Sequence, residues 1–421
     1  MSPTREIDRR GFLRHSAGTL AGVVGVTRLA AGAASSSALP TQVANAVAPI
    51  TDEERRRRIE RAQRLMAEQG IRAIVLEPGS SAFYYTGVRW GLSERPFLTL
   101  ISARGLPAYV VPAFEEERAR ELIAISSDIR VWQEDESPYH VAAQLLRDRG
   151  TATGRVGIEE EMRFFVFDGI RRVAPRARLV SAMPVTRGCR MIKSAAEIAH
   201  MQLANDLTIN VFRSAFASLV EGITQDALAA TIAKRFAEDA VSGGALVLFG
   251  SSTAFPHGSR EPKALREGDV VLVDGGCSVG GYQSDVTRTI VLGIPTPRQR
   301  DIWTLERRAQ DAAFAAAQVG ATCESVDAAA RKLITDAGFG PGYRVPGLPH
   351  RTGHGIGLDG HESPHFVRGE KMRLRPGMCF SDEPTIVIYP EFGIRLEDCL
   401  YMTESGPHMF TKQSEAIDRP F

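Results

Sequence analysis

The chain has 421 residues, of which 43% are hydrophobic and 24% charged, and its formal net charge at pH 7 is +1. This length allows two domains with substantial cores, and the composition is ordinary for a soluble globular protein. A net charge so close to zero gives no electrostatic basis for a nucleic-acid or membrane-surface binding protein. The five cysteines are odd in number and lack Cys-x-x-Cys spacing, which argues against a complete disulfide framework and a structural zinc site.

Residues 1–33 have the pattern of an export signal. The segment DRRGFLRHSAGTLAGVVGVTRLAAGA carries paired arginines, Arg9 and Arg10, followed by a weakly apolar stretch that ends in small residues. The pattern resembles a bacterial twin-arginine signal, so we expect a periplasmic or extracellular protein; a tail without a targeting role is the alternative. Residues 34–50 have the composition of a linker, and the sequence predicts no stable membrane span.

Residues 51–187 are predicted to form an N-terminal α/β domain. A helix is expected to begin after Thr51 as its N-cap, with Glu54 three residues later, and to stop at Gly70. Short β-branched runs follow (RAIVLE, PFLTLIS, AYVVP, DIRVW and RVGIE), and they alternate with helical stretches such as FEEERARELIA. This alternation is typical of a sheet covered by helices.

Residues 188–421 are predicted to form a second, α+β domain. It begins with a long helix, N-capped by Ser194 with Glu197 three residues later, and a second helix follows. Strands are then expected in ALVLFG, VVLVD and DVTRTIVL, two more helices over 297–318 and 323–338, and final strands in MCFSDEPTIVIY and FGIRLEDCLYM. Strand runs separated by helix pairs indicate helices on one face of an antiparallel sheet.

Four acidic residues stand in apolar strand sequences of this second domain. Asp274 is expected to end one strand and Asp285 to begin the next, with the glycines of GGCSVGGYQS forming the turn between them; Glu383 and Glu397 are expected in mid-strand. A phosphate loop is disfavoured because the Gly-Lys-Ser/Thr ending and a following helix are both missing. Acids in apolar strands are rarely buried alone, and four converging carboxylates would repel one another. Two divalent cations would cancel their charge.

Four of the nine histidines fall in the single segment LPHRTGHGIGLDGHESPH, at His350, His354, His361 and His365. Glycines allow the backbone to approach a ligand closely, so a histidine cluster among them favours a functional site. His354 could complete the shell of the acidic cluster. Four carboxylates and one imidazole form a hard, oxygen-rich set, which favours Mn²⁺, with Co²⁺ or Zn²⁺ as alternatives.

Together, the motifs VDGG…SDVTRT, TGHGIGLDGHE, DEP and IRLED resemble those of the pita-bread metallopeptidase family. They span most of residues 245–400. The segments RLMAEQGIRAIVLEPGSSAFYYTG and RMIKSAAEIAHMQ resemble the N-terminal domain of its creatinase, prolidase and aminopeptidase P branch. The resemblance implies a C-terminal pita-bread domain, a smaller creatinase-like α/β domain before it, and a homodimer or higher homo-oligomer. It also implies cleavage of the Xaa-Pro bond at the N-terminus of dipeptides or short peptides.

The resemblance also assigns a metal site and proton-transfer groups. It implies two metal ions, with Asp285 and Glu397 bridging them, and Glu383 as the proton shuttle to the leaving amine. The implied ligands are Asp274, Asp285, His354, Glu383 and Glu397. It further implies that His257 and His361 hydrogen-bond the substrate and that His350 lies near the leaving residue.

Two arginines are candidates for recognising a free C-terminal carboxylate. Arg351 lies beside His350 and favours a dipeptidase, because the residue after the cleaved bond of a dipeptide carries the free C-terminal carboxylate that an arginine could bind. Arg395 lies two residues before Glu397 and is equally suited to orient the acidic ligands.

Two other functions remain open at this point. One is a creatinase-like C–N hydrolase that works without metal, and the other is a non-catalytic peptide-binding member of the fold. The complete set of five ligands counts against both, since such relatives have lost ligands.

Overall fold

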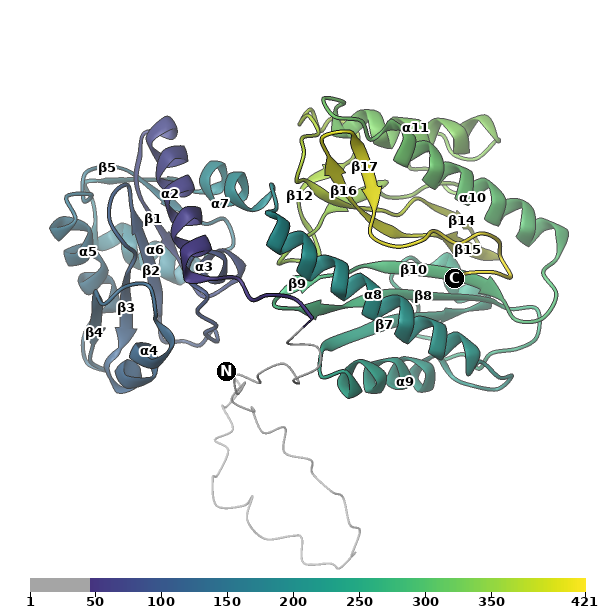
Figure 1. Cartoon of the computed structure of the whole chain (residues 1–421), viewed down its shortest axis with the longest axis horizontal. Helices are drawn as coiled ribbons and strands as arrows, with labels where there is room; N and C mark the ends of the chain where they lie inside the picture. The colour runs from purple at the N-terminus through teal and green to yellow at the C-terminus, as the bar shows by residue number, and fades with distance from the viewer. Residues whose placement is uncertain (1–45) are drawn as a thin grey trace, which may run out of the picture. The chain divides into compact units, whose positions relative to one another are not determined.

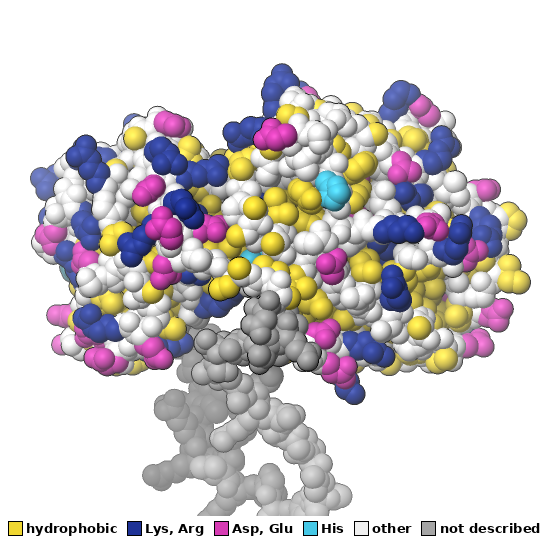
Figure 2. Space-filling model, in the orientation of Figure 1, with side chains coloured by type: hydrophobic (Ala, Val, Ile, Leu, Met, Phe, Trp, Pro, Cys, Tyr) yellow, Lys and Arg dark blue, Asp and Glu magenta, His cyan; other side chains and the backbone are white. Residues whose placement is uncertain are grey.

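The computed structural model describes residues 46–421. The predicted export signal, residues 1–33, lies outside the described residues, as does most of the predicted linker. Within the described part of the chain, no helix combines the length and the apolar character needed to cross a membrane. On the face shown in Figure 2, acidic and basic side chains are intermixed, in keeping with the net charge of +1.

A six-stranded mixed sheet forms the centre of the N-terminal region, in the order β4-β3-β2-β1-β5-β6 (Figure 1). Its central strand β1 pairs antiparallel with β2 and parallel with β5. The strands are β1 (Ile71–Leu76), β2 (Leu98–Ser102), β3 (Ala108–Pro112), β4 (Ile129–Trp132), β5 (Gly154–Ile158) and β6 (Ala177–Ser181). The sequence predicted the first five. The sixth is a partly exposed edge strand, so it lacks a clear apolar pattern.

The helices of this region begin and end at ordinary capping signals. The hydroxyl of Thr51 accepts a hydrogen bond from the Glu54 amide, and Gly70 ends the same helix with a left-handed φ of 63°, as predicted. The α-helices are α2 (Asp52–Gln69), α3 (Ser80–Thr86), α4 (Glu116–Leu122), α5 (Pro138–Asp148), α6 (Phe164–Val173) and α7 (Met183–Arg190). A short 3₁₀ helix, η2 (Ala113–Glu115), precedes α4. Apolar side chains of α5 and α6 pack on the sheet and form a core with it.

The C-terminal region combines antiparallel sheets with two helix pairs, which confirms the α+β prediction. Its first helix carries the predicted capping box of Ser194 and Glu197. The helices are α8 (Ala195–Ala217), α9 (Gln225–Glu238), α10 (Pro297–Ala316) and α11 (Cys323–Asp336), with the 3₁₀ helix η3 (Gly250–Ala254). Apolar residues of α8 and α9 pack against β7 and β8 in one core, while α10 and α11 contribute to another (Figure 1).

The strands of this region form three sheets. The first has the order β10-β8-β7, with β9 paired to β8; the second has the order β12-β11-β13-β16-β17; β14 and β15 pair with each other. The strands are β7 (Ser242–Phe249), β8 (Val270–Val279), β9 (Tyr282–Gln283), β10 (Val286–Val291), β11 (Gly353–Gly355), β12 (Glu362–Phe366), β13 (Cys379–Asp382), β14 (Thr385–Ile388), β15 (Phe392–Arg395), β16 (Asp398–Thr403) and β17 (Gly406–Met409).

Two predicted mid-strand acids lie instead at breaks between strands. Glu383 falls between β13 and β14, and Glu397 falls between β15 and β16. The breaks occur because β13 and β16 pair in the five-stranded sheet, whereas β14 and β15 leave it and pair only with each other. Pro384 supports the first break, since it has no N–H to donate to a ladder. Both chain segments therefore change sheets at the acidic residue.

The glycine-rich segment also differs from its prediction. Asp274 lies inside β8, which continues to Val279, and the turn is made by Gly280 and Gly281 with φ of 60° and 99°. Gly275 and Gly276 belong to the strand. A Cβ on Gly276 would lie 2.0 Å from the carbonyl oxygen of Ser284, so this glycine permits close contact between chain segments and is not part of a turn.

Candidate metal centre

The five predicted metal ligands come together from separate strands and strand breaks. Three groups of side chains each place their ligand atoms within 4.8 Å of one another: Asp274, Asp285 and Glu397; His354, Glu383 and Glu397; and Asp285, His354 and His361. Glu397 is shared by the first two groups, and Asp285 by the first and third. This sharing is the arrangement that two bridging carboxylates between adjacent metal ions require.

Burial and mutual repulsion disfavour the ionised form of two carboxylates in this cluster. Burial, and then the neighbouring charge of Asp274, raise the pKa of Asp285 to about 7. Burial, and then the charge of Asp285, raise the pKa of Glu397 well above its usual range. Both groups therefore favour protonation unless a cation joins them.

Two buried atoms of the cluster have no hydrogen-bond partner, and both face it. They are Nε2 of His354 and Oε1 of Glu397. His354 Nδ1 lies 3.1 Å from the carbonyl oxygen of Gly355, a contact that suits an N–H on Nδ1 and leaves Nε2 with its lone pair. That Nε2 lies 3.2 Å from Glu383 Oε1 and 3.8 Å from Asp285 Oδ2. Unpartnered acceptor atoms surrounded by carboxylates fit divalent metal ions.

Arg395 contacts the acidic ligands directly. Its side chain is 3% exposed, its Nη2 lies 2.5 Å from Oδ2 of Asp274, and its Nε donates to the Thr287 hydroxyl at 3.2 Å. These contacts support the alternative that Arg395 orients a ligand. A guanidinium buried against Asp274 has little freedom to receive a substrate carboxylate.

Thr287 is a residue of the site that sequence reasoning missed. Its hydroxyl lies 2.8 Å from Oδ1 of Asp274 and 2.7 Å from Oε2 of Glu397, and the residue is fully buried. The signal was present in SDVTRT, because Thr287 follows Asp285 by two residues and therefore shares its strand face. A threonine between two ligating carboxylates fixes their relative orientation.

Glu383, the predicted proton shuttle, lies against two histidines. Burial would raise the pKa of Glu383, but its close contact with His354, at 3.2 Å, outweighs burial and lowers that pKa to about 2. His350 Nε2 lies 3.1 Å from the Thr385 hydroxyl and its Nδ1 lies 2.7 Å from the carbonyl oxygen of Arg351, so its ring is held beside this end of the site. Burial lowers the pKa of His350.

The other predicted histidines differ in their placement. The His361 ring centroid lies 3.9 Å from that of His354, and Arg351 Nη2 lies 2.9 Å from His361 Nδ1. The structure therefore brings His361 and Arg351 to the metal centre. His257 lies exposed after η3, and among the described residues it has no hydrogen bond to a ligand; only the preceding residue, Pro256, reaches the site, through Arg395 at 3.4 Å.

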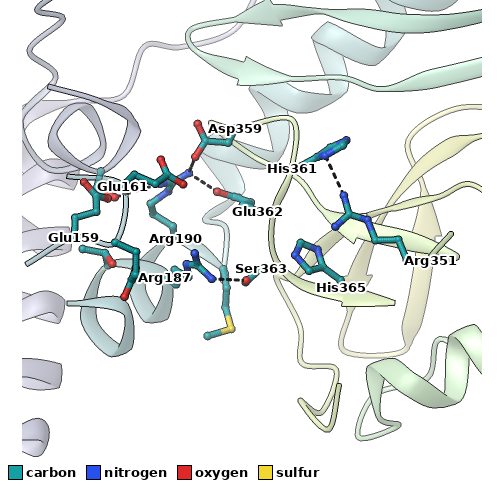
Figure 3. Close-up of a pocket in the computed structure, with 14 residues that line it drawn as sticks. Glu159, Glu161, Arg187, Arg190, Arg351, Asp359, His361, Glu362, Ser363 and His365 are labelled. Carbon is teal, nitrogen blue, oxygen red and sulfur yellow. Dashed lines mark hydrogen bonds and ion pairs between the residues drawn. The ribbon is translucent and has the colours of Figure 1, made fainter. Parts of the chain in front are cut away.

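A cavity of about 160 Å³ opens beside His361 (Figure 3). Its walls include Arg351, His361 and His365 on one side and glutamates Glu159 and Glu161 on the other. The position of the cavity next to a residue in contact with His354 makes it a candidate for holding part of a substrate.

The five cysteines are all free and buried. Cys399 donates from Sγ to the carbonyl oxygen of Asp285 at 3.1 Å, and no cysteine belongs to a candidate metal group within the described residues.

Comparison with known proteins identifies relatives over both regions. Residues 199–404 match metallopeptidase family M24, and residues 58–192 match the creatinase/prolidase N-terminal domain. A probable dipeptidase PepE from Mycobacterium tuberculosis is 36% identical over 355 residues, which cover 83% of this chain and 92% of that protein. An Xaa-Pro dipeptidase from Lactobacillus helveticus is 32% identical over 334 residues, which cover 78% of this chain and 89% of that one.

Solved structures give the same result. The crystal structure of dipeptidase PepE from Mycobacterium ulcerans is similar with a TM-score of 0.80 at 31% identity, covering 88% of this chain and 98% of that one. A prolidase from Thermococcus sibiricus is similar with a TM-score of 0.77 at 30% identity, covering 85% of this chain and 96% of that one.

Proposed function

The chain belongs to metallopeptidase family M24, in its prolidase branch, and we propose that it is an Xaa-Pro dipeptidase that works with two divalent metal ions. It is a metal-dependent peptidase with a complete ligand set. The observation that carries the proposal is the sharing of Glu397 between the Asp274–Asp285 group and the His354–Glu383 group. A creatinase-like hydrolase or a non-catalytic binding protein would have no need of this arrangement.

The ligating residues would be Asp274, Asp285, His354, Glu383 and Glu397. When bound, two divalent ions lower the pKa of water and stabilise negative charge that develops on the scissile carbonyl oxygen. Arg395 and Thr287 hold Asp274 and Glu397 in position through the hydrogen bonds described above.

The remaining side chains of the site are proposed to transfer protons and to contact the substrate. We propose that Glu383 moves a proton to the leaving nitrogen, which in an Xaa-Pro bond carries no hydrogen of its own. His361 and His350 both lie near this carboxylate, and His257 is proposed to join them when substrate is bound. The contact of His350 Nε2 with the Thr385 hydroxyl, at 3.1 Å, supports this role because it fixes the ring.

A preference for dipeptides is proposed from Arg351. Its guanidinium lies beside His361 and at the wall of the cavity, where the carboxylate of a one-residue leaving group would end. Steady-state kinetics with Ala-Pro and Ala-Pro-Ala test this, together with metal analysis and EDTA treatment. A higher kcat/KM for Ala-Pro that EDTA abolishes is expected. A preference for the tripeptide would refute the dipeptide proposal, and EDTA-insensitive turnover would revive the metal-independent alternative.

We propose Mn²⁺ as the metal in vivo. The ligand set has four carboxylates and one imidazole and lacks a thiolate, which suits a hard cation. Reconstitution of the metal-free protein with Mn²⁺, Co²⁺ or Zn²⁺ would rank the ions by activity, and Mn²⁺ bound to protein purified from its native host would support the proposal most directly.

We also propose export through the twin-arginine signal at residues 1–33, and assembly into a homodimer. The first rests on Arg9 and Arg10 and the apolar stretch after them, and the second on the family resemblance. Cell fractionation of the chain and of its Arg9→Lys/Arg10→Lys variant tests export, because the protein should stay inside the cell once the arginine pair is replaced. Light scattering on the purified protein tests the dimer.

A further inference from the structure

Arg288 is a fully buried cation of β10, next to Thr287 in the sequence. A guanidinium has five N–H donors, and three of those of Arg288 are used beside the candidate metal centre. Nη1 donates to the carbonyl oxygens of Thr287 and Glu397 at 3.1 and 2.9 Å, and Nη2 donates to Oδ1 of Asp398 at 2.7 Å. Arg288 therefore binds the main chain of Glu397, whose carboxylate is shared by two of the candidate metal groups.

The other two donors of Arg288 bind residues 411–421, the last segment of the chain. Nη2 donates to the carbonyl oxygen of Lys412 and Nε donates to that of Pro420, both at 3.0 Å. In Figure 1 the end of this segment, marked C, lies beside β10, the strand that carries Arg288. One guanidinium thus joins both ends of the segment to the backbone of Glu397.

Asp398 makes a second connection between the segment and the metal centre. It follows Glu397 directly and is fully buried. The hydroxyl of Thr411 donates to Oδ1 of Asp398, the oxygen that Arg288 also binds, and Gln310 of α10 donates from Nε2 to Oδ2 at 3.1 Å. The residue beside Glu397 is therefore held by contacts from β10, α10 and the segment together.

The segment has few hydrogen bonds of its own. The Arg419 amide donates to the carbonyl oxygen of Ala416 at 2.9 Å, and the Ser414 hydroxyl donates to that of Pro420 at 3.2 Å. Its attachment to the rest of the domain comes from outside, because Ile417 is 3% exposed in the core cluster to which α10 and α11 contribute. Packing of the segment therefore depends on the groups that bind it, Arg288 among them.

The segment contributes no ligand of its own. Among the described residues, no side chain of 411–421 belongs to a candidate metal group. The segment also lies outside residues 199–404, which match the peptidase family. Its contacts with the metal centre run through Arg288 and Asp398, so any effect on metal binding has to pass through these two residues.

We propose that Arg288 is a positioning residue that couples residues 411–421 to Glu397, so that packing of this segment and metal binding favour each other. The inference rests on the proposed two-metal function. Coupling between two binding events is reciprocal: if packing of the segment strengthens metal binding, metal binding strengthens packing by the same factor. Arginine suits this role because its planar group holds several acceptors at once, whereas the lysine ammonium has three donors on a flexible stem.

Hydrogen–deuterium exchange of the metal-free and Mn²⁺-loaded protein, read by mass spectrometry, tests the coupling without turnover. In the parent, Mn²⁺ should slow exchange in residues 411–421, while α5 should exchange equally with and without the ion. Arg288→Lys keeps a charge for Asp398 but loses two donors, so the slowing by Mn²⁺ in residues 411–421 should largely disappear. Equal slowing in the parent and in Arg288→Lys, or no slowing in a parent that binds Mn²⁺, would overturn the coupling.

Calorimetric titration of the metal-free protein with Mn²⁺ gives the reciprocal measurement. Arg288→Lys should bind Mn²⁺ about tenfold more weakly than the parent, as expected for a residue that orients a metal ligand. Ile417→Ala, which loosens the segment and leaves Arg288 in place, should also bind the ion more weakly. Ile334→Ala is the matched control, because it removes the same side chain from the same core cluster and should keep the parent's affinity.

The two isoleucine variants keep the proposal testable if Arg288→Lys does not fold. Equal Mn²⁺ affinity in Ile417→Ala and Ile334→Ala would overturn the coupling, because loss of core packing alone would then explain both. A parent chain that binds no Mn²⁺ would overturn the two-metal function and the coupling with it. Normal binding by the parent, with unchanged affinity in Arg288→Lys, would overturn the coupling alone.

Discussion

Arg395 donates from Nη2 to Oδ2 of Asp274 at 2.5 Å, and this contact joins a buried cation to a carboxylate of the proposed metal pair. The contact holds Asp274 in one orientation. Residues that orient metal ligands typically contribute tenfold to hundredfold in metal affinity.

Arg395→Met should therefore weaken metal binding by about tenfold to hundredfold, because Asp274 loses both its partner and its orientation. Isothermal titration calorimetry with Mn²⁺ on the metal-free protein measures this. Arg395→Lys keeps the charge but loses the paired donors, so it should fall between the parent and Arg395→Met. If Arg395→Met kept full metal affinity and instead raised only the KM for dipeptides, Arg395 would be a substrate residue after all.

Thr287→Val removes the hydroxyl between Asp274 and Glu397 while keeping the shape of the side chain. We expect about tenfold weaker metal binding and a lower kcat, because two carboxylates lose their shared donor. Thr287→Ser retains the hydroxyl and serves as the control. Equal metal affinity in the valine and serine variants would show that the hydroxyl does not orient these ligands.

Gly276→Ala should destabilise the protein by about 1–3 kcal/mol or more, because the new Cβ would lie 2.0 Å from the backbone oxygen of Ser284. The shift forced on Ser284 would also move Asp285, the residue that follows it. Urea unfolding measures the change. Gly244→Ala, on the paired strand β7, is the matched control because nothing lies within 4 Å of its added Cβ. Similar stability losses in both variants would contradict the close-contact role of Gly276.

The contribution of Asp285 to the stability of the metal-free protein should fall as pH rises from about 4 to 7. The pKa of Asp285 rises from 3.8 to about 7 on folding, through burial first and the charge of Asp274 second. A carboxyl group of this kind contributes stability below its unfolded pKa and loses it as pH approaches the folded pKa. Metal binding should reverse the trend, since the ions bind the deprotonated ligands.

Thermal melting of the metal-free and Mn²⁺-loaded protein at pH 5, 6 and 7 checks this prediction. The stabilisation by Mn²⁺ should grow with pH, and calorimetry in buffers of different ionisation enthalpy should record proton release at pH 6. Stabilisation that stays constant over this range would mean that Asp285 and Glu397 are already charged in the metal-free protein.

The four acidic ligand residues could be predicted from the sequence as acids in strand segments, whereas the assignment of His354 and of the complete set rests on the family resemblance. Thr51 and Ser194 were likewise predictable caps, since capping depends on residues three positions apart. In contrast, the strand breaks at Glu383 and Glu397 follow from which sheet each half-strand joins, and this pairing is a property of the tertiary structure.

The same limit applies to Arg395. Whether an arginine is paired with an acid depends on side chains far away in sequence, such as Asp274 for Arg395. The exposed position of His257 was also not predictable, because its segment contains no periodic pattern that would fix its burial.

We propose that Asp274, Asp285, His354, Glu383 and Glu397 would together hold two divalent metal ions, and that Asp285 is essential to this site. The most direct measurement is the metal content of the purified protein and of Asp285→Asn, by plasma mass spectrometry after dialysis, with circular dichroism to confirm folding. We predict about two ions per parent chain, and in the folded Asp285→Asn variant a loss of metal together with Ala-Pro hydrolysis. Two retained ions and undiminished turnover in Asp285→Asn would show that Asp285 is not needed for the metal centre.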